Sequence, residues 1–178
     1  MTDREELLQE IKDHAVVHGK VTLASGREAD YYVDLRRITL SAAAAPQVGR
    51  VLLDLTKDWE FDAVGGMTLG ADPIATAMLH AAANEDRQLD ACVVRKEGKS
   101  HGMQRRIEGP EVKGRRVLAV EDTSTTGGTV LDAVTALREA GADVIGIVTL
   151  VERGAAPAIE AIGLPYRYAY DLTDLGLA

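Results

Sequence analysis

Short apolar strands alternate with helices from residue 61 onward, and this alternation is the feature that most constrains the fold. The predicted strands are 61–67, 89–94, 115–121, 143–151 and 166–172. The predicted helices between them are 72–83, 128–140 and 155–162. Strands that are almost continuously apolar are typical of a parallel sheet covered by helices on both faces. Ligands of such sheets bind at the carboxyl ends of the strands, which here are the loops after Met67, Glu121 and Val151.

The first 60 residues have a less regular pattern. The predicted elements are a helix over 3–17, strands over 20–23 and 31–35, and a helix over 41–58. Thr2 and Glu5 are spaced as a capping box for the first helix, whereas Pro46 leaves the start of the last one open. We find no repeat, low-complexity tract or linker, so we expect one α/β domain over 1–178.

Composition limits the class of protein. The chain is 46% hydrophobic and 27% charged, which is the usual balance of a soluble globular domain. Its apolar runs are too short to cross a membrane, and its charged first residues lack the apolar core of a signal peptide. Cys92 is the only cysteine, so neither an internal disulfide nor a cysteine zinc cluster is expected, and a buried thiol is the simplest reading. We therefore expect a cytoplasmic protein without a membrane partner.

The net charge of −8 disfavours a nucleic-acid partner, because such proteins need basic surface. The charge is uneven, however. Residues 95–106, "RKEGKSHGMQRR", carry five Lys/Arg against one Glu, a local charge of +4, so the rest of the chain carries −12. Glycines and Pro110 in and after this segment predict a mobile loop, which could be an ordinary solvated loop or a cationic lid over an anionic ligand.

The segment 117–129, "VLAVEDTSTTGGT", combines two kinds of chemistry. Its second half places hydroxyls and glycines at the start of a helix, an arrangement that binds phosphate. It is neither a Walker A loop nor a GxGxxG motif. The preceding acids, Glu121 and Asp122, repel phosphate but accept hydrogen bonds from a diol. Ribose 5-phosphate would satisfy both halves; the alternative is an acidic helix cap followed by a Thr-rich turn.

The segment 117–129 resembles the signature of the type I phosphoribosyltransferases. Three further segments narrow the resemblance to the orotate phosphoribosyltransferases: "RKEGKSHG" (95–102) is similar to their catalytic loop, "TLASGREADYY" (22–32) to their N-terminal Ser-Gly-Arg segment, and "LVERG" (150–154) to the segment with the orotate-binding arginine. The resemblance implies a Rossmann-like parallel twisted sheet flanked by helices. It also implies a small N-terminal hood over 1–40 and a mobile catalytic loop over 95–110.

The resemblance also implies roles for individual residues. Those expected to bind 5-phosphoribosyl 1-pyrophosphate are Arg95, Lys96, Lys99, His101, Glu121, Asp122, Thr123, Ser124, Thr125, Thr126, Gly127, Gly128 and Thr129. Thr125 and Arg153 are expected to hold orotate, whose carboxylate a guanidinium can pair with bidentately. Tyr32 is either a base-stacking residue or a half-buried strand aromatic. Lys99, His101 and Asp122 are the expected catalytic residues.

The implied reaction is orotate plus 5-phosphoribosyl 1-pyrophosphate giving orotidine 5′-monophosphate and pyrophosphate, in pyrimidine biosynthesis. Lys99 and His101 would stabilise and protonate the leaving group, while the acids would favour an oxocarbenium-like ribose. Mg²⁺ is expected as cofactor, held by substrate and water with no direct protein ligand. In this family the loop reaches the neighbouring subunit's site, so the resemblance implies a homodimer in which residues 95–106 act in the partner's site.

Two positions depart from the family pattern. Ala24 precedes Ser-Gly-Arg where the family often has Lys, and Leu69 stands where it often has Lys in the loop after strand 61–67. The roles of those lysines are therefore not transferred to this chain. Two alternatives stay open: a phosphoribosyltransferase for another base, such as a purine or uracil, and a non-catalytic regulator that senses a phosphoribosyl ligand.

Overall fold

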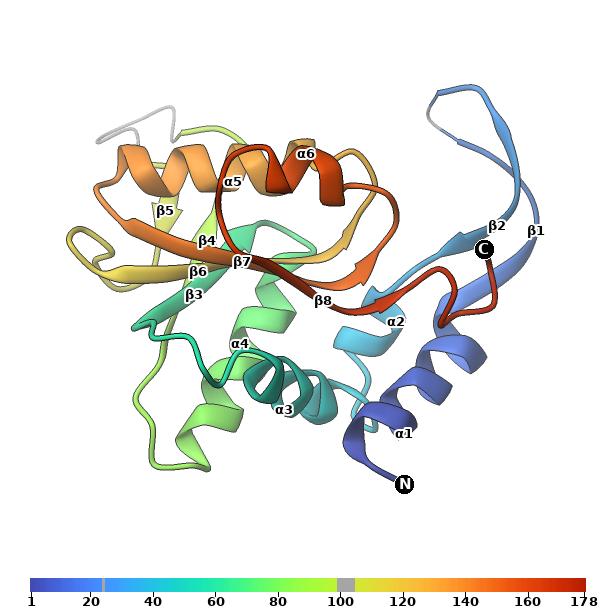
Figure 1. The fold of residues 1–178 in the computed structure, drawn as a ribbon, viewed down its shortest axis with the longest axis horizontal. Helices are drawn as coiled ribbons and strands as arrows, with labels where there is room; N and C mark the ends of the chain where they lie inside the picture. The colour runs from blue at the N-terminus through green and yellow to red at the C-terminus, as the bar shows by residue number, and fades with distance from the viewer. Residues whose placement is uncertain (24, 99–104) are drawn as a thin grey trace.

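The fold consists of a central sheet with helices on both faces and a separate two-stranded hairpin (Figure 1). The computed structural model describes residues 1–23, 25–98 and 105–178. The strands are β1 (Val16–Thr22), β2 (Glu28–Val33), β3 (Ala63–Met67), β4 (Asp90–Val94), β5 (Ile107–Glu108), β6 (Arg116–Ser124), β7 (Asp143–Glu152) and β8 (Tyr166–Asp171). The helices are α1 (Asp3–Glu10), a π-helical turn η1 (Ile11–Ala15), α2 (Arg36–Thr39), α3 (Ala45–Leu55), α4 (Ala71–Ala83), α5 (Gly128–Glu139) and α6 (Ala156–Glu160).

The sheet has the strand order β5-β4-β3-β6-β7-β8 within the described residues. All neighbouring strands are parallel except β5, which runs antiparallel to β4. The predicted parallel sheet is thus confirmed apart from its antiparallel edge strand β5, and within this sheet each helix-containing connection joins parallel neighbours. After β4 the chain returns to the other side of β3, so the direction of strand addition reverses between β3 and β6. Ligands of open α/β sheets bind at the carboxyl ends of such a strand pair.

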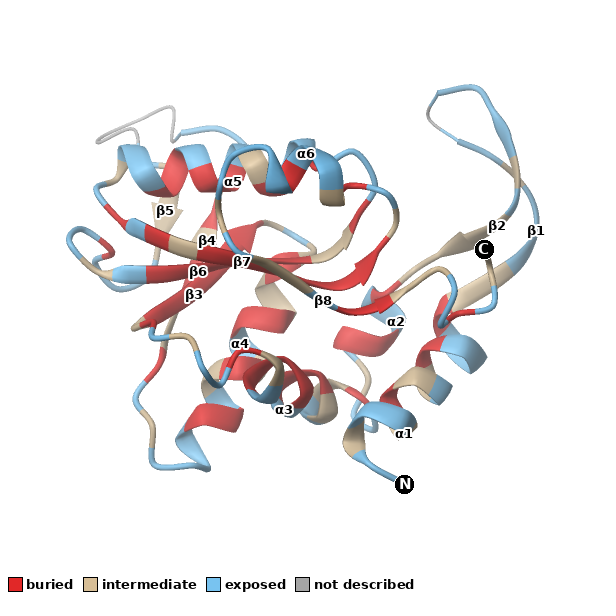
Figure 2. Ribbon diagram, in the orientation of Figure 1, coloured by how far each residue is buried: buried red, intermediate tan, exposed pale blue. Residues whose placement is uncertain are grey.

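Strand β6 shows why helices cover both faces. Successive side chains of a strand point to opposite faces, and all residues from Val117 to Val120 are buried. Leu118 and Val120 pack with α1, α3 and α4 in one hydrophobic cluster. Val117 and Ala119 pack with α5 and α6 in the other. Figure 2 shows the buried residues concentrated on the strands and on the helix sides that face them.

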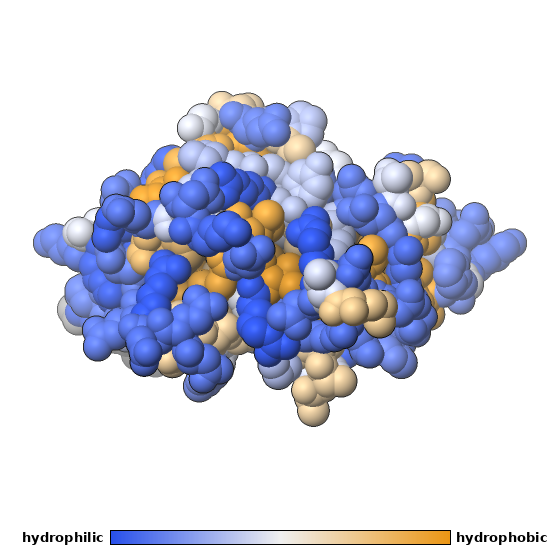
Figure 3. All heavy atoms as spheres, turned by 60° about the horizontal axis from the view of Figure 1, so that its bottom comes forward, coloured by the Kyte–Doolittle hydropathy of each residue, from blue (hydrophilic) through white to orange (hydrophobic). Residues whose placement is uncertain are grey.

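The solvent side of the lower helical layer is polar. The face turned forward in Figure 3 is largely hydrophilic, with smaller hydrophobic areas between the charged side chains. This agrees with the amphipathic pattern of α3, whose buried residues are Val48, Gly49, Val51, Leu52 and Leu53. None of the helices in the described ranges combines the length and apolarity that a bilayer crossing requires.

The N-terminal region differs in part from the prediction. The Thr2–Glu5 capping box is confirmed. The helix predicted over 3–17 ends at Ala15, because Val16 is extended and begins β1, as β-branched residues favour. Strands β1 and β2 pair as a hairpin that projects from the body of the fold (Figure 1). The Tyr170 hydroxyl donates to the Arg4 carbonyl at 2.7 Å, which ties α1 to β8.

Candidate functional site

The loops after β3 and β6 come together at the predicted binding edge. Gly70, in the β3–α4 loop, lies against both acids of β6. A Cβ at this position would be 2.7 Å from the Asp122 Oδ1 and 2.8 Å from the Glu121 Oε1. Any larger residue would therefore push the loop away from the carboxylates. The structure thus brings residue 70 next to residues 121 and 122, a contact that sequence reasoning did not predict.

Glu121 is a buried acid at the end of the sheet. Glu121 is only 5% exposed, and its Oε1 accepts a hydrogen bond from the Asp122 backbone N–H at 3.1 Å. The Oε2 atom is buried and has no hydrogen-bond partner among the described residues. Burial, and secondarily the neighbouring Asp122, raises the pKa of Glu121 well above its ordinary value. A buried carboxyl oxygen without a partner is unfavourable, so this atom is suited to receive a donor or a cation from a ligand.

Thr68 and Asp72, next to the acids Glu121 and Asp122, were not predicted from the sequence. We call the carboxylates of Asp72, Glu121 and Asp122 the acidic wall. The Thr68 hydroxyl donates to the Asp72 Oδ2 at 2.6 Å. The Asp72 Oδ1 is buried without a partner in the described part of the chain, and burial raises the pKa of this carboxyl. The available signal was an acid two residues after Gly70, just beyond the apolar strand that ends at Met67. Leu69, the departure from the family pattern, is 59% exposed in the same loop.

The hydroxyl-rich loop forms the start of α5, as predicted. Gly127 has a φ of +85°, a left-handed conformation that favours glycine and turns the chain into the helix. The N-cap Gly127 has no side chain to cap this helix, and the Gly128 N–H makes only a long hydrogen bond, 3.4 Å, to the exposed Thr126 hydroxyl. The start of the helix is therefore suited to bind an anion. The exposed residues of the loop are Thr125, Thr126, Gly128 and Thr129. Ser124 is buried within β6, while Thr123 has a buried hydroxyl without a described partner.

Arg153 follows β7 directly and lies beside this loop. Its backbone N–H donates to the Ser124 carbonyl at 2.9 Å, and β6 and β7 are paired up to Ser124 and Glu152. A Cβ on the next residue, Gly154, would lie 3.6 Å from the Thr125 carbonyl. The Arg153 Nε is buried and has no described hydrogen-bond partner. Arg153 and Thr125, the two predicted orotate residues, are therefore neighbours.

The basic segment leaves the sheet beside the β3–α4 loop. Arg95 pairs with Glu108 at 3.3 Å, and Lys96 is exposed. These residues line a groove of about 800 Å³ whose lining residues are Thr68, Val93, Arg95, Lys96, Glu97, Gly98 and Glu108. Arg95 and Lys96 thus share the groove with Thr68, whose hydroxyl donates to Asp72 in the first turn of α4. The predicted residues Lys99 and His101 lie outside the described residues, as does Ala24.

The far end of the basic segment is held by α5. The Arg106 guanidinium donates to both carboxylate oxygens of Asp132, at 2.9 and 3.3 Å, and its Nε donates to the Arg95 carbonyl at 3.0 Å. Residues 107 and 108 form β5 within the segment predicted as a mobile loop. Arg106 therefore fastens the start and end of the segment to each other and to the helix of the phosphate loop.

Two other predicted residues have simpler surroundings. Cys92 is buried, as predicted, and burial raises the pKa of its thiol to about 11, so it is no nucleophile. Tyr32 is half-buried on the hairpin strand β2, opposite Val17. Its proposed stacking against the base stays a prediction.

Within the described ranges, no group of three or more His, Cys, Asp or Glu is arranged to hold a metal ion.

Comparison with known proteins decides the family. The model of the family described as the phosphoribosyl transferase domain matches residues 39–162. The orotate phosphoribosyltransferase of Streptomyces avermitilis is 71% identical over 177 residues, which cover 98% of this chain and 97% of that protein. The chain belongs to the orotate phosphoribosyltransferase family. The resemblance inferred from the four motifs is thereby confirmed.

Solved structures of this family share the whole fold. A crystal structure of the Mycobacterium tuberculosis orotate phosphoribosyltransferase in complex with Fe(III) dicitrate has a TM-score of 0.91 and 57% identity, covering 99% of this chain and 100% of that one. Another, in complex with 5-phospho-alpha-D-ribosyl 1-diphosphate, has a TM-score of 0.87 and 52% identity, with the same coverage. The predicted type I phosphoribosyltransferase fold is therefore correct.

Proposed function

We propose that this chain transfers the phosphoribosyl group of 5-phosphoribosyl 1-pyrophosphate to orotate, giving orotidine 5′-monophosphate and pyrophosphate in pyrimidine biosynthesis. The observation that carries the proposal is the grouping of three features at one edge of the sheet. These are the Glu121 Oε2, the N-terminus of α5 and the Arg153 Nε; the Glu121 and Arg153 atoms have no hydrogen-bond partner among the described residues. They match a diol, a phosphate and a carboxylate, the three groups that the two substrates bring.

The ribose and its phosphate occupy the two halves of the β6–α5 segment in this proposal. Glu121 and Asp122 offer oxygen acceptors to the ribose hydroxyls, and the negative charge of Asp122 favours the positive character that develops on the ring. The loop from Thr123 to Thr129 binds the 5-phosphate through backbone N–H groups, hydroxyls and the helix dipole. Because the loop follows the acids directly, one rigid strand end sets the distance between the two groups.

Arg153 gives the site its choice of base. Its guanidinium pairs with the orotate carboxylate, which uracil lacks, and the buried Nε gains a partner on binding. Thr125 completes the contact to the base at the junction with the phosphate loop. A ring nitrogen of orotate then faces the anomeric carbon from the side opposite the leaving group, and this alignment lowers the entropic barrier.

The pyrophosphate leaves toward the basic segment. Arg95 and Lys96 line the groove beside the β3–α4 loop, which suits the charge that builds on the departing oxygens. Lys99 and His101 stay predicted contributors, with His101 as the proton donor near neutral pH. The segment 95–106 of the partner's chain would complete each site in the proposed homodimer.

The acidic wall fits a divalent cation that arrives with the substrate. Mg²⁺ prefers carboxylate and phosphate oxygens, and Asp72 and Glu121 each offer a buried oxygen without a described partner. When bound, Mg²⁺ would neutralise the pyrophosphate and orient it against the ribose. The protein residues contribute individual oxygen acceptors rather than a complete set of metal ligands.

The cytoplasmic location expected from the sequence stays a prediction.

Steady-state assays with orotate, uracil and hypoxanthine test the proposal. We expect turnover with orotate in the presence of Mg²⁺ and far less with the other two bases. Turnover with hypoxanthine but not orotate would assign the enzyme to another base. Binding of 5-phosphoribosyl 1-pyrophosphate without turnover of any base would support the regulator instead.

A further inference from the structure

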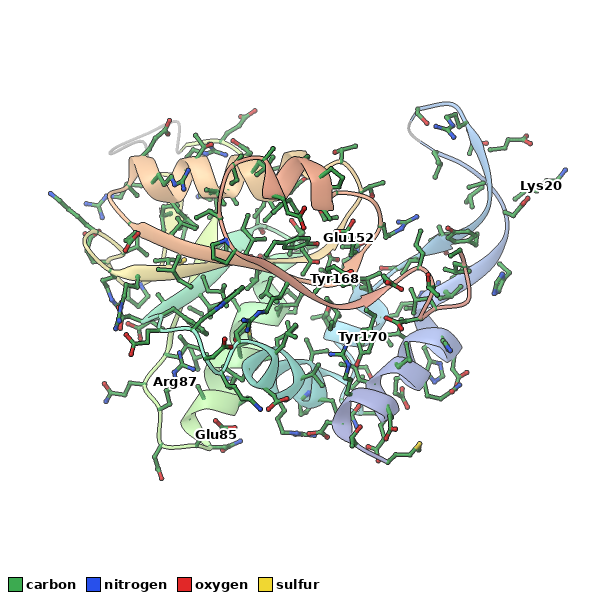
Figure 4. All side chains as sticks on the ribbon, in the orientation of Figure 1. Lys20, Glu85, Arg87, Glu152, Tyr168 and Tyr170 are labelled. Carbon is green, nitrogen blue, oxygen red and sulfur yellow. The ribbon has the colours of Figure 1, made fainter. Side chains whose placement is uncertain are left out.

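A buried carboxylate lies directly behind Arg153, and none of the roles above uses it. Glu152 is the last residue of β7 and is 7% exposed (Figure 4). Its Oε1 accepts hydrogen bonds from the backbone N–H groups of Gly154 and, at 3.1 Å, Ala156. Its Oε2 accepts from the Tyr166 hydroxyl at 2.5 Å. The Tyr166 oxygen is in turn 2.8 Å from the Thr149 hydroxyl.

The direction of these hydrogen bonds follows from the number of protons. A tyrosine hydroxyl has one proton, which here goes to Glu152, so the Thr149 hydroxyl must donate to Tyr166. The chain therefore runs from Thr149 through Tyr166 to the carboxylate. Burial, with Glu152 next in importance, raises the pKa of the Tyr166 hydroxyl far above its ordinary value, so it stays a donor.

The carboxylate holds the backbone on the far side of Arg153. Residue 153 lies between Glu152 and Gly154, and the Gly154 N–H is one of the two backbone donors. The other donor belongs to Ala156, the first residue of α6, so the turn and the start of the helix are fixed together. Gly154 has a φ of +116°, a conformation that few other residues adopt. The orientation of the Glu152 carboxylate, through these two hydrogen bonds, therefore helps to fix the backbone at Arg153.

The same turn supports the phosphate loop. A Cβ at Gly127 would meet three side chains of the turn and α6 at 3.5–3.7 Å, namely those of Ala155, Ala158 and Ile159. The Arg153 N–H donates to the Ser124 carbonyl of β6. The turn thereby adjoins the phosphate loop and carries the base-binding arginine. A buried carboxylate destabilises the folded protein unless it is hydrogen-bonded, and an apolar side chain of similar size would fill the same space without that penalty. The presence of Glu152 here therefore points to a role beyond packing.

We infer that Glu152 is a positioning residue for the base site: oriented by Tyr166, it fixes the turn that presents the Arg153 guanidinium to the carboxylate of orotate. Glu152 itself touches no substrate in this account. The inference rests on the proposed function, because the orotate carboxylate is the group that Arg153 is positioned to meet. It adds two residues, Glu152 and Tyr166, to those that determine the choice of base.

Tyr166→Phe is the most selective variant, because it keeps the ring and removes only the hydroxyl that orients Glu152. We expect the KM for orotate to rise by about tenfold, as for the loss of one charge-assisted hydrogen bond, while the KM for 5-phosphoribosyl 1-pyrophosphate changes by less than about twofold. Tyr168→Phe is the matched control. Tyr168 lies on the same strand, is 38% exposed, and its ring centroid is 5.8 Å from that of Tyr166.

Two variants of Glu152 separate geometry from charge. Glu152→Gln retains an oxygen for the Gly154 and Ala156 N–H groups and can donate its amide to Tyr166, whose proton then turns to Thr149. We expect its KM for orotate to stay within about threefold of wild type, whereas Glu152→Ala raises it by more than about tenfold. A glutamine variant as impaired as the alanine variant would contradict a positioning role. If Glu152→Ala does not fold, the glutamine and tyrosine variants carry the test.

A double-mutant cycle with Arg153→Ala distinguishes positioning from general stability. If Tyr166 acts through Arg153, Tyr166→Phe has no further effect on the KM for orotate once Arg153 is absent. Equal effects in both backgrounds would overturn the inference. A wild-type protein that does not turn over orotate would instead overturn the proposed function, and the inference with it. Orotate turnover with an unchanged KM in Tyr166→Phe would overturn the inference alone.

Discussion

Arg153 donates its backbone N–H to the carbonyl of Ser124 at 2.9 Å, across the paired ends of β7 and β6. This hydrogen bond brings Arg153, the proposed base-binding residue, to the start of the hydroxyl-rich loop, although 29 positions separate the two residues in the sequence. The relationship is a property of the parallel sheet, in which neighbouring strands end at the same edge. The residues proposed for base choice and for phosphate binding therefore lie at the ends of one pair of strands.

Arg153→Ala should impair orotate use selectively. Loss of a buried ionic hydrogen bond to the carboxylate should raise the KM for orotate by about 10–100-fold, with little change in the KM for 5-phosphoribosyl 1-pyrophosphate. Steady-state kinetics with each substrate varied in turn measures both. Arg138→Ala, at an exposed position in the last turn of α5, is the control and should behave as wild type. Equal losses for the two substrates would remove Arg153 from the base site.

Gly70→Ala tests the contact between the β3–α4 loop and the acids. The added methyl group would lie under 3 Å from oxygens of both Asp122 and Glu121, so the loop or the acids must move. We expect affinity for 5-phosphoribosyl 1-pyrophosphate to fall by about tenfold or more while the protein stays folded, because the collision is confined to the site. Isothermal titration with this ligand and circular dichroism measure the two quantities. Unchanged affinity would place the ribose elsewhere.

The raised pKa of Glu121 predicts how stability depends on pH. The folded protein keeps a proton on Glu121 at pH values where the unfolded chain has lost it. Below pH 4.5, the ordinary pKa of a glutamate, the protonated Glu121 contributes fully to the free energy of unfolding. This contribution is lost as the pH rises from 4.5 toward the raised pKa of the folded protein. Glu121→Gln, which cannot ionise, should lose less stability than wild type between about pH 5 and about pH 8.

Urea unfolding of the ligand-free protein at several pH values measures this difference. Asp143→Asn, which removes an exposed carboxylate at the start of β7, is the matched control. It should leave the pH dependence as in wild type. Parallel pH profiles for Glu121→Gln and wild type would mean that Glu121 is ionised in the folded protein.

Asp132→Asn should loosen the basic segment without unfolding the protein. Its carboxylate binds Arg106 through two hydrogen bonds, but half of the Asp132 side chain is exposed, so the free energy of unfolding should fall by less than about 1 kcal/mol. We expect kcat to fall several-fold, because the segment that carries Lys99 is less well held, and the KM for orotate to stay close to wild type. Thermal unfolding and steady-state kinetics provide the two readouts. A wild-type kcat would show that this anchor has no part in turnover.

The sheet could be predicted from the sequence because its strands are continuous apolar runs, and buried parallel strands leave that pattern without long-range information. Strand β5 could not, since Ile107–Glu108 is a strand only through its pairing with Val93 and Val94. The π-helical turn before Val16 was missed for a similar reason: the helix periodicity continues into residues that the hairpin recruits as β1.

The candidate site was predictable where one segment carries the chemistry and hidden where two segments share it. Glu121, Asp122 and the hydroxyl loop are contiguous, so their motif identified them. Gly70 and Asp72 matter because β3 lies next to β6, and no local pattern reveals that neighbourhood. Glu152 was seen only as part of a motif around Arg153, since its partner Tyr166 is on another strand.

Phosphoribosyl transfer to orotate is measured most directly as product formation by the purified protein. The protein is incubated with orotate, 5-phosphoribosyl 1-pyrophosphate and Mg²⁺, and orotidine 5′-monophosphate and pyrophosphate are quantified. We expect both products to appear in equal amounts and to depend on Mg²⁺, and we expect Arg153→Ala to slow their formation greatly at low orotate. Absence of orotidine 5′-monophosphate, with a purine nucleotide formed instead when hypoxanthine is supplied, would contradict the proposed transfer.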